Sequence, residues 1–355
     1  MKVSHQGFTL LELMIALTLG LILVAVAVQL LVSSQGNYRI QQAASVIQDS
    51  GVFSLNAVTK NIRIANHGNA GLLDDEASYS GIVLTAQSAG KRDEQTLGGN
   101  LTGLKIGSTD VDGEDYVSRS SSHQGAITEK SDQLVIMYQA PRDMTTCTGR
   151  PVKGPTKSFS DTTGTLTLSK GWYVIERYYI KKDGKNSHLY CSDARFIADT
   201  KDAPSTYQKN TLSSARVLDK DYVTQAGQMI AKNVDYMKVQ LIVRHELLKK
   251  KADGTQEFVT NNVDTMDLSE FEDYKKAAYQ KLAAIDKKDS PKLLVGIVGV
   301  NLAWLVKSDS TIKNVERVKY PVMGQDITVA DDKFMRHVYS TTIALRNGGL
   351  GELEK

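Results

Sequence analysis

One carboxylate lies in an otherwise apolar stretch close to the N-terminus. Residues 8–32 read FTLLELMIALTLGLILVAVAVQLLV, and Glu12 is the only charged side chain among these 25 residues. As an α-helix the stretch would be roughly 37 Å long, which is enough to cross a hydrocarbon layer of about 30 Å. A carboxylate inside a membrane costs on the order of 2.5 to 3.5 kcal/mol at mid-helix. A plain membrane anchor leaves Glu12 unexplained, so this residue is the first candidate functional group.

Oxygen ligands for a cation are concentrated in one loop, which contains Asp110, Asp112, Glu114 and Asp115. Such carboxylates could bind Ca²⁺, but their spacing is not that of an EF-hand. A solvated acidic turn is the favoured interpretation. The basic run Lys249–Lys251 lacks interleaved aromatic residues, so we interpret it as a solvated loop rather than a DNA contact.

The residue patterns of known enzyme classes do not occur in the sequence. It contains no glycine-rich phosphate loop, no HExxH and no GxSxG, and its six histidines are dispersed. The two cysteines, Cys147 and Cys191, form no cluster at zinc-ligand spacing. With 43 basic and 40 acidic side chains the net charge is +3, which gives no bulk reason to expect a polyanionic partner. We therefore predict a protein without catalytic residues, cofactor or structural metal.

The element that carries Glu12 is predicted to be one long helix, residues 8–66, with a transmembrane part (8–32) and a part that packs on a sheet (33–66). Beyond residue 32, apolar side chains recur at steps of three and four, which marks one stripe. Its members are Ile40, Ala44, Ile47, Gly51, Leu55, Val58, Ile62 and Ala65. The helix should end at Asn66-His67-Gly68, since glycine suits a left-handed cap. At roughly 90 Å the helix is longer than a compact domain needs, so its first half must protrude.

Residues 67–355 are predicted to form a globular, β-rich domain. Short apolar runs alternate with glycine, serine and aspartate, which indicates strands joined by loops. The expected strands are residues 81–86, 101–106, 133–138, 172–180, 234–244, 293–306 and 336–346. A long helix followed by strands predicts an α+β fold in which the helix lies on an antiparallel sheet.

A second, amphipathic helix is predicted as an insertion at residues 264–290. Ser269 and Glu272 would form its capping box, and Pro291 would stop it. Its apolar stripe should pack on the domain's own sheet, and docking to another subunit is the alternative. The stripe comprises Phe271, Tyr274, Ala278, Leu282 and Ile285.

The first residues resemble a known processing signal. The stretch Gly7-Phe8-Thr9-Leu10-Leu11-Glu12 is similar to the class III signal of type IV pilins, which is cut after the glycine. The resemblance implies that residues 1–7 are a leader peptide and that Phe8 becomes a methylated N-terminus. The Phe8 ammonium would lie at i,i+4 from Glu12, so the two charges could neutralise each other. In a filament, Glu12 would also meet the first residue of a neighbouring subunit.

Two other interpretations of this segment stay open. Ala25-Val26-Ala27 fits the cleavage pattern of an ordinary secretory signal, and an exported binding protein or enzyme would then start at Val28. Against this, the apolar run continues beyond Ala27, and the apolar segment of an ordinary secretory signal does not contain an acidic residue such as Glu12. A plain membrane anchor is the other interpretation.

The rest of the chain resembles the PilW family of minor pilins at scattered positions. They include Tyr38-Arg39, Gly51-Val52-Phe53, Ile62-Arg63-Ile64-Ala65, Ser131-Asp132-Gln133-Leu134, Asn233-Val234-Asp235, Tyr339-Ser340-Thr341, Cys147 and Cys191. One departure is Val52, where an arginine is common. The resemblance implies a pilin fold and places both cysteines in an exported domain, where disulfides persist. A Cys147–Cys191 bridge would close a loop of about 45 residues and contribute roughly 4 kcal/mol, and two unpaired thiols are the alternative.

The resemblance implies a structural subunit rather than an enzyme. As a minor pilin it would prime type IV pilus assembly and enter the filament at or near its tip, in support of twitching motility, adhesion or DNA uptake. Its partners would be other minor pilins, the major pilin, the prepilin peptidase/methyltransferase and the inner-membrane assembly platform. Its globular domain would face the periplasm before reaching the extracellular pilus. A type II secretion pseudopilin of the J type is the alternative.

Overall fold

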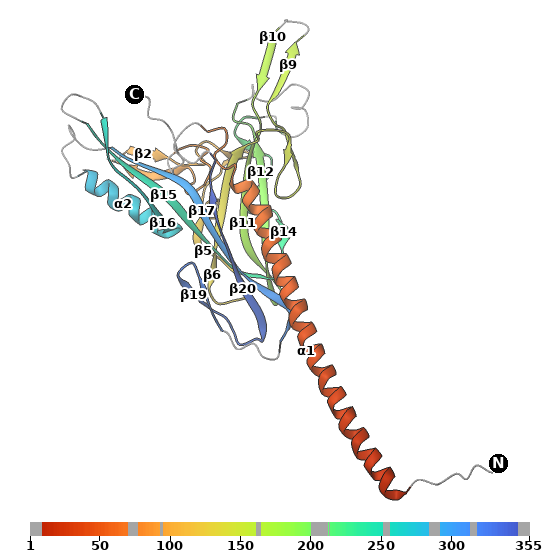
Figure 1. The fold of residues 1–355 in the computed structure, drawn as a ribbon. Coiled ribbons are helices and arrows are strands. Elements are labelled where there is room, and N and C mark those ends of the chain that lie inside the picture. The colour runs from red at the N-terminus through yellow and green to blue at the C-terminus, as the bar shows by residue number, and fades with distance from the viewer. Residues whose placement is uncertain are drawn as a thin grey trace.

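One long helix and two antiparallel sheets make up most of the protein (Figure 1). The computed structural model describes residues 9–69, 77–92, 95–160, 165–199, 212, 214–250, 256–283, 292–312 and 318–346. The helix leaves the body at one end as a free stem, and its second half lies against the strands. The predicted α+β class, with a long helix packed on an antiparallel sheet, is confirmed.

The long helix, α1 (Leu10–Ile62), runs without a break for 53 residues. It contains no proline, so its backbone hydrogen bonds continue from the stem into the body. Every side chain from Leu10 to Gln42 is exposed. From Ala43 onward one face is buried, and its members are Ala43, Ile47, Gly51, Ser54, Val58, Asn61 and Ile62. The predicted stripe thus includes most of the docked face, whereas Ile40 remains on the stem.

The helix ends four residues earlier than predicted. Asn66 N–H donates to Met137 O in a strand at 3.0 Å instead of continuing the helical ladder, while Ile64 and Ala65 make tighter bonds to Asn61 O and Ile62 O. Gly68 has a φ of +89°, as expected for a left-handed cap, and follows a turn rather than the helix itself. The contact with the sheet therefore decides where α1 stops.

The larger sheet has five antiparallel strands in the order β14-β12-β11-β6-β5. They are β5 (Arg119–Gln124), β6 (Lys130–Gln139), β11 (Tyr173–Asp183), β12 (Asn186–Phe196) and β14 (Gln228–Ala231). From Leu134 to Tyr138, strand β6 is apolar on both faces because both are covered. Leu134, Ile136 and Tyr138 pack toward α1, and Val135 and Met137 pack under loops.

The second sheet has four antiparallel strands in the order β16-β15-β17-β20. They are β15 (Val234–Lys250), β16 (Gln256–Asp267), β17 (Lys292–Thr311) and β20 (Phe334–Ala344). The hairpin of β18 (Lys319–Val322) and β19 (Gln325–Thr328) covers part of its far face with an apolar cluster that includes Tyr236, Leu305 and Tyr320. Helix α1 contacts β17 and β20 of this sheet and β14 of the other, so it lies across both.

The two sheets are joined by side chains of β6 that bond to the backbone of β15. Ser131 Oγ accepts from Met237 N at 3.3 Å, and Asp132 Oδ2 accepts from Val239 N at 2.9 Å. The other oxygen of Asp132 accepts from Ser121 N at 3.0 Å. Burial raises the pKa of Asp132 to about 6, because few water molecules remain to solvate its charge.

Shorter elements complete the body. They are β1 (Ser88–Arg92), β2 (Gln95–Gly98), β3 (Lys105–Ile106), β4 (Thr109–Asp110), β7 (Met144–Thr145), β8 (Pro151–Val152), β9 (Thr156–Ser160), β10 (Thr165–Ser169), β13 (Val217–Leu218) and the 3₁₀ turn η1 (Glu114–Tyr116). The hairpin β9–β10 projects at the end of the body remote from the stem (Figure 1).

Two predicted strands are wrong. Residues 81–86 form only an isolated bridge, Ile82 to Ile136, and within residues 101–106 only β3 is extended. These segments cover a face of β6 as loops, and single contacts such as Val83 N to Val135 O satisfy their backbone. Their apolar residues reflect burial of loop side chains rather than a ladder.

The second helix, α2 (Leu268–Ala283), begins four residues later than the predicted insertion. Residues 264–267 belong to β16, whose ladder with β15 extends to Asp267↔Gln240, so the helix begins after it. Asp267 N donates to Glu270 Oε2 at 2.8 Å, which caps the first turn of the helix. The side chain of Glu272, predicted to form a capping box with Ser269, lies outside the described residues. Phe271 is buried in the protein's own core, as predicted. Residues 284–291 lie outside the described residues.

Candidate assembly surface

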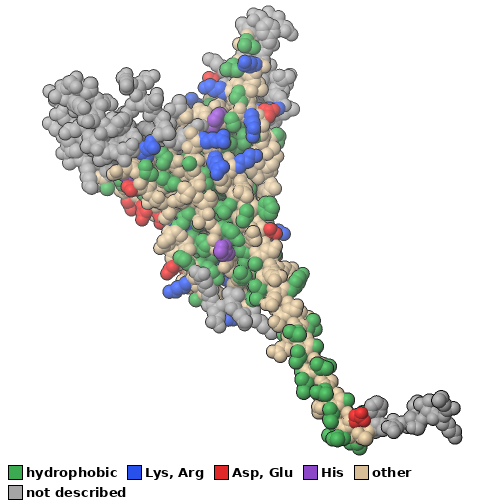
Figure 2. All heavy atoms as spheres, in the orientation of Figure 1, with side chains coloured by type: hydrophobic (Ala, Val, Ile, Leu, Met, Phe, Trp, Pro, Cys, Tyr) green, Lys and Arg blue, Asp and Glu red, His purple; other side chains and the backbone are tan. Residues whose placement is uncertain are grey.

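The stem of α1, Leu10–Gln42, is the largest apolar surface of the described chain. Its large apolar side chains up to Val32 are between 51% (Val26) and 77% (Leu10) exposed. Figure 2 shows hydrophobic side chains along the stem and an acidic group near its N-terminal end. By length and composition α1 is able to cross a membrane. A contiguous apolar surface of this size requires lipid or another protein to cover it.

Glu12 lies in the first turn of α1. Its backbone N–H donates to Thr9 Oγ1 at 3.2 Å, so Thr9 caps the helix, and an acidic side chain there is favoured by the helix dipole. The sequence analysis missed this cap, although Thr9-x-x-Glu12 is the spacing of a capping box. Gly7 and Phe8, the predicted cleavage and methylation positions, lie outside the described residues.

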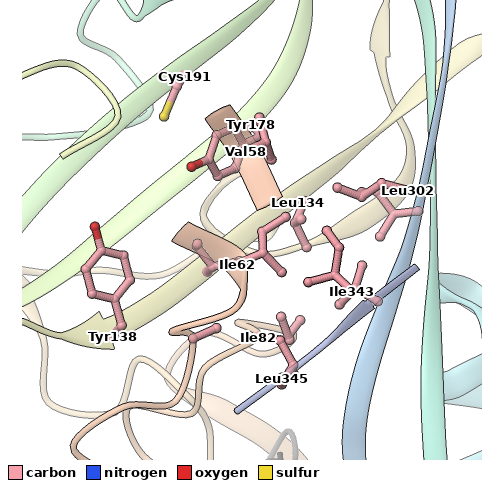
Figure 3. Packing of buried hydrophobic residues seen from close by; sticks show 14 of the residues in the cluster. Val58, Ile62, Ile82, Leu134, Tyr138, Tyr178, Cys191, Leu302, Ile343 and Leu345 are labelled. Carbon is pink, nitrogen blue, oxygen red and sulfur yellow. The ribbon is translucent and has the colours of Figure 1, made fainter. Parts of the chain in front are cut away.

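The docked half of α1 approaches the second sheet closely at one glycine. A Cβ added at Gly51 would lie 2.3 Å from Cε2 of Tyr339 in β20. The tyrosine ring therefore occupies the space that any other residue would need. Figure 3 shows Val58 and Ile62 of the same helix among Leu134, Leu302 and Ile343 from both sheets.

A buried carboxylate fixes the C-terminal end of α1 to the larger sheet. Glu176, on β11, is fully buried and accepts hydrogen bonds from Asn61 Nδ2 at 2.9 and 3.1 Å. The hydroxyls of Tyr138 (2.9 Å) and Tyr178 (2.6 Å) and the backbone N–H of Cys147 (2.7 Å) donate to it as well. Burial raises the pKa of Glu176, and these donors oppose that rise by stabilising the carboxylate.

The expected disulfide is present beside Glu176. Cys147 is bonded to Cys191 with a Cα–Cα distance of 6.3 Å, which closes a loop across a sequence separation of 44. The bridge holds the Cys147 N–H that donates to Glu176. Among the described residues, only Cys147, Glu176 and Cys191 bring three metal-ligand atoms within 4.8 Å of one another, and their sulfurs are already bonded to each other.

The acidic loop is paired within the chain. Arg119 contacts Glu114 and lies 3.4 Å from Asp115, while Lys105 lies 3.8 Å from Asp110. Two separate cations thus pair with three of the four carboxylates, and Asp112 is exposed, an arrangement typical of a solvated acidic turn. The side chains of Lys249 and Lys250, and all of Lys251, lie outside the described residues.

The sequence analysis did not identify Asn61 or Glu176. Asn61 is a polar residue inside the apolar stripe, next to Ile62, and Glu176 is a charged residue inside an apolar predicted strand. Each anomaly was visible on its own. Their pairing was not, because 115 residues separate them.

Two separate segments of the chain match known protein families. Residues 3–28 match the prokaryotic N-terminal methylation motif, and residues 177–347 match the family described as Type IV Pilus-assembly protein W. Among solved structures, a type IV-like pilin from Thermus thermophilus matches at 9% identity with a TM-score of 0.32, covering 84% of this chain and 95% of that chain. No curated protein sequence matches.

The methylation motif extends into the apolar stem of α1, and the two together are those of a type IV pilin-like protein with a class III signal. Within that class, residues 177–347, a little under half of the chain, match the PilW family. The matched family is one of type IV pilus-assembly proteins.

Proposed function

We propose that this protein is a minor pilin that helps to start type IV pilus assembly and is incorporated at or near the pilus tip. The observation that supports this most directly is the exposed apolar stem, which carries Glu12 in its first turn and continues rigidly into a docked half. Lipid covers such a stem before assembly, and the stems of other subunits replace the lipid in a filament. The protein acts by assembly and not by catalysis.

Processing would prepare the stem for that exchange. Removal of residues 1–7 leaves an ammonium on Phe8, four residues before Glu12, and the two charges compensate each other in a low-dielectric surrounding. In a filament, Glu12 can also pair with the Phe8 ammonium of a neighbouring subunit, and this second pairing forms only when the two stems are in axial register. Glu12 would therefore set the axial position of each subunit.

The implied partners follow from this route. A prepilin peptidase/methyltransferase acts on Gly7 and Phe8, an assembly platform in the inner membrane receives the processed chain, and other minor pilins and the major pilin contact its stem. The body stands on the periplasmic side until the pilus carries it outside the cell, where it supports twitching motility, adhesion or DNA uptake.

The test uses the full chain in its own host. N-terminal mass analysis should find a mature protein that begins with methylated Phe8. Glu12→Ala should be made and cleaved but should be strongly depleted from sheared pili, whereas Ser33→Ala, an exposed polar change on the same stem, should be incorporated normally. Equal incorporation of the Glu12 variant and the wild type would refute the role of this carboxylate.

Deletion of the gene tests the finer assignment. We expect loss of surface pili, with restoration by the wild-type chain and labelling of the restored filaments at one end by antibodies to the body. Intact pili together with loss of secreted exoproteins would instead identify a secretion pseudopilin of the J type.

A further inference from the structure

One strand edge of the described body is long, uncharged and unpaired. Strand β20 is the last strand of the second sheet, and among the described strands it pairs with β17 alone. From Val338 to Ala344 it reads VYSTTIA, without a charged residue, glycine or proline. An edge of this kind is a template for pairing with another strand, and proteins usually protect it with charges, proline or a bulge.

The direction of the backbone groups along β20 follows from two hydrogen bonds at its end. Leu345 N donates to Val298 O at 3.0 Å, toward β17, whereas Arg346 N points the other way and donates to Arg63 O at 3.1 Å. Alternate residues of an antiparallel strand direct their N–H and C=O groups to the same side. Four residues therefore turn these groups away from β17, and no described residue bonds to them there. They are Val338, Ser340, Thr342 and Ala344.

The other edges of the two large sheets in the described chain carry the usual protection. Strand β14 has only four residues. Strand β5 pairs with β6 in an irregular register between Arg119 and His123. Strand β16 carries Asp264 and Asp267 and is contacted by α2. The edge of β20 has none of these features, and the side chains of three of its four outward residues are exposed, so it is open to a partner.

We propose that the edge of β20 accepts an extended segment from the body of another pilin-like subunit, which adds a fifth strand to the four-stranded second sheet. This proposal rests on the proposed function, because subunits that assemble through their stems bring their bodies together. A strand is the partner that fits, since an extended backbone satisfies the N–H and C=O groups of alternate residues at once. From Val338 to Ala344 the edge is roughly 20 Å long, which is the length of a typical strand.

The position of β20 favours a pilin subunit as the source of that strand. Strand β20 contacts α1, and the ring of Tyr339 lies against Gly51. In Figure 1 the strand lies in the part of the body nearest the stem. Subunits that enter the pilus after a tip subunit lie toward its stem end, so the body of such a subunit comes to the side of β20. Only the far end of the edge is already occupied, by the bond from Arg346 N to Arg63 O.

The experiment places a photo-crosslinking residue, p-benzoylphenylalanine, at single positions of the full chain in piliated cells. Positions 340 and 342 probe the edge of β20, position 22 probes the exposed stem, and position 124, exposed on the edge strand β5, is the matched control. Crosslinked peptides are identified by mass spectrometry. We expect positions 340 and 342 to react with one strand in the body of another pilin chain, at sites about two residues apart, because paired strands advance together. Position 22 should react with the N-terminal helix of another pilin chain, and position 124 with no pilin body.

The outcomes separate this proposal from the proposed function. Helix crosslinks from position 22 without any from positions 340 and 342 would overturn the strand addition and leave the minor pilin assignment standing. Crosslinks from the β20 edge to a helix, to lipid or to a protein without a pilin signal would overturn it too, as would an equal yield from position 124. Crosslinks from neither the stem nor the edge would count against both proposals.

A pair of variants at one position provides a second readout. Thr342→Pro removes an outward N–H and leaves the ladder with β17 in place, since proline is tolerated where the N–H of an edge strand faces solvent. It should lower the crosslink yield from position 340 by about tenfold or more, which corresponds to roughly 1.4 kcal/mol. Thr342→Ala removes the same side chain, keeps the N–H and should leave the yield unchanged.

Equal melting temperatures of the two variants would verify that both fold. An undiminished yield in Thr342→Pro would contradict the proposal. If the proline variant is less stable, the two-residue offset between the crosslinks from positions 340 and 342 in the otherwise unchanged chain decides the matter, and its absence would overturn the strand addition.

Discussion

Removal of the Glu176 side chain tests how α1 is held on the body. In Glu176→Ala, four donor groups lose their acceptor: the Asn61 amide, the hydroxyls of Tyr138 and Tyr178, and the Cys147 N–H. Each buried donor left without a partner costs about 1–3 kcal/mol. Two effects reduce this cost: the tyrosine hydroxyls can rotate toward other acceptors, and removal of the buried charge removes its desolvation penalty. We therefore expect Glu176→Ala to lower the free energy of unfolding by about 3–5 kcal/mol.

This loss would be a large part of a typical stability of roughly 5–15 kcal/mol. Urea unfolding of the full, detergent-solubilised chain measures it through tryptophan fluorescence, because both tryptophans, Trp172 and Trp304, are buried in the body. Glu176→Gln keeps one acceptor oxygen and should lose less, about 1–3 kcal/mol. Glu114→Ala removes an exposed carboxylate paired with Arg119 and should change stability by about 1 kcal/mol at most.

A double-mutant cycle shows whether the helix and the sheet are coupled through this contact. Asn61→Ala and Glu176→Ala should each destabilise the protein, and together they should cost less than the sum of the two, since both remove the same hydrogen bonds. Strict additivity, or a Glu176→Ala variant within about 1 kcal/mol of wild type, would refute the account of Glu176 as the anchor of α1.

Two further predictions concern the joint between the sheets and the closest helix contact. Lowering the pH from 6 to 4 should stabilise the wild type relative to Asp132→Asn by about 2–3 kcal/mol in urea unfolding. The reason is that burial raises the pKa of Asp132 from 3.8 to about 6, so the folded state takes up the proton at a higher pH than the unfolded state does. A stability difference between the two proteins that does not change with pH would contradict this. Gly51→Ala should destabilise the body by about 1–3 kcal/mol in the same assay, since its methyl group meets the Tyr339 ring. The control is Gly36→Ala, whose added Cβ meets no described atom within 4 Å, and equal stability of the two variants would argue against the contact.

The sequence predicts those features that depend on neighbours along the chain. The recurrence of Ile47, Val58 and Ile62 at helical spacing identifies the docked face of α1, because residues three and four apart lie on one side of a helix. Long apolar runs likewise identify β6, β11, β15 and β17, since strands covered on both faces need few polar residues.

Features that depend on distant partners were not predictable in the same way. The end of α1 is set by the bond from Asn66 N to Met137 O, and no local signal separates Ile62 from Asn66 as the last residue. The start of α2 was misplaced because Asp264 and Thr265 belong to β16, whose polar sequence gives no strand pattern. At the assembly surface, Glu12 stands out in the sequence, whereas the exposure of Phe53 emerges only after the body has covered the opposite side of the helix.

The single unbroken helix also determines how the molecule responds to tension. A pull on the N-terminal end travels along the helix axis into the docked half, whose contacts from Ala43 to Ile62 lie side by side along that axis. They are therefore loaded together in shear rather than peeled apart one at a time. The Asn61 hydrogen bonds to Glu176 lie at the far end of this row, so detachment of the helix requires the whole row to slide, and the mechanical strength of the subunit is that of all its contacts acting at once.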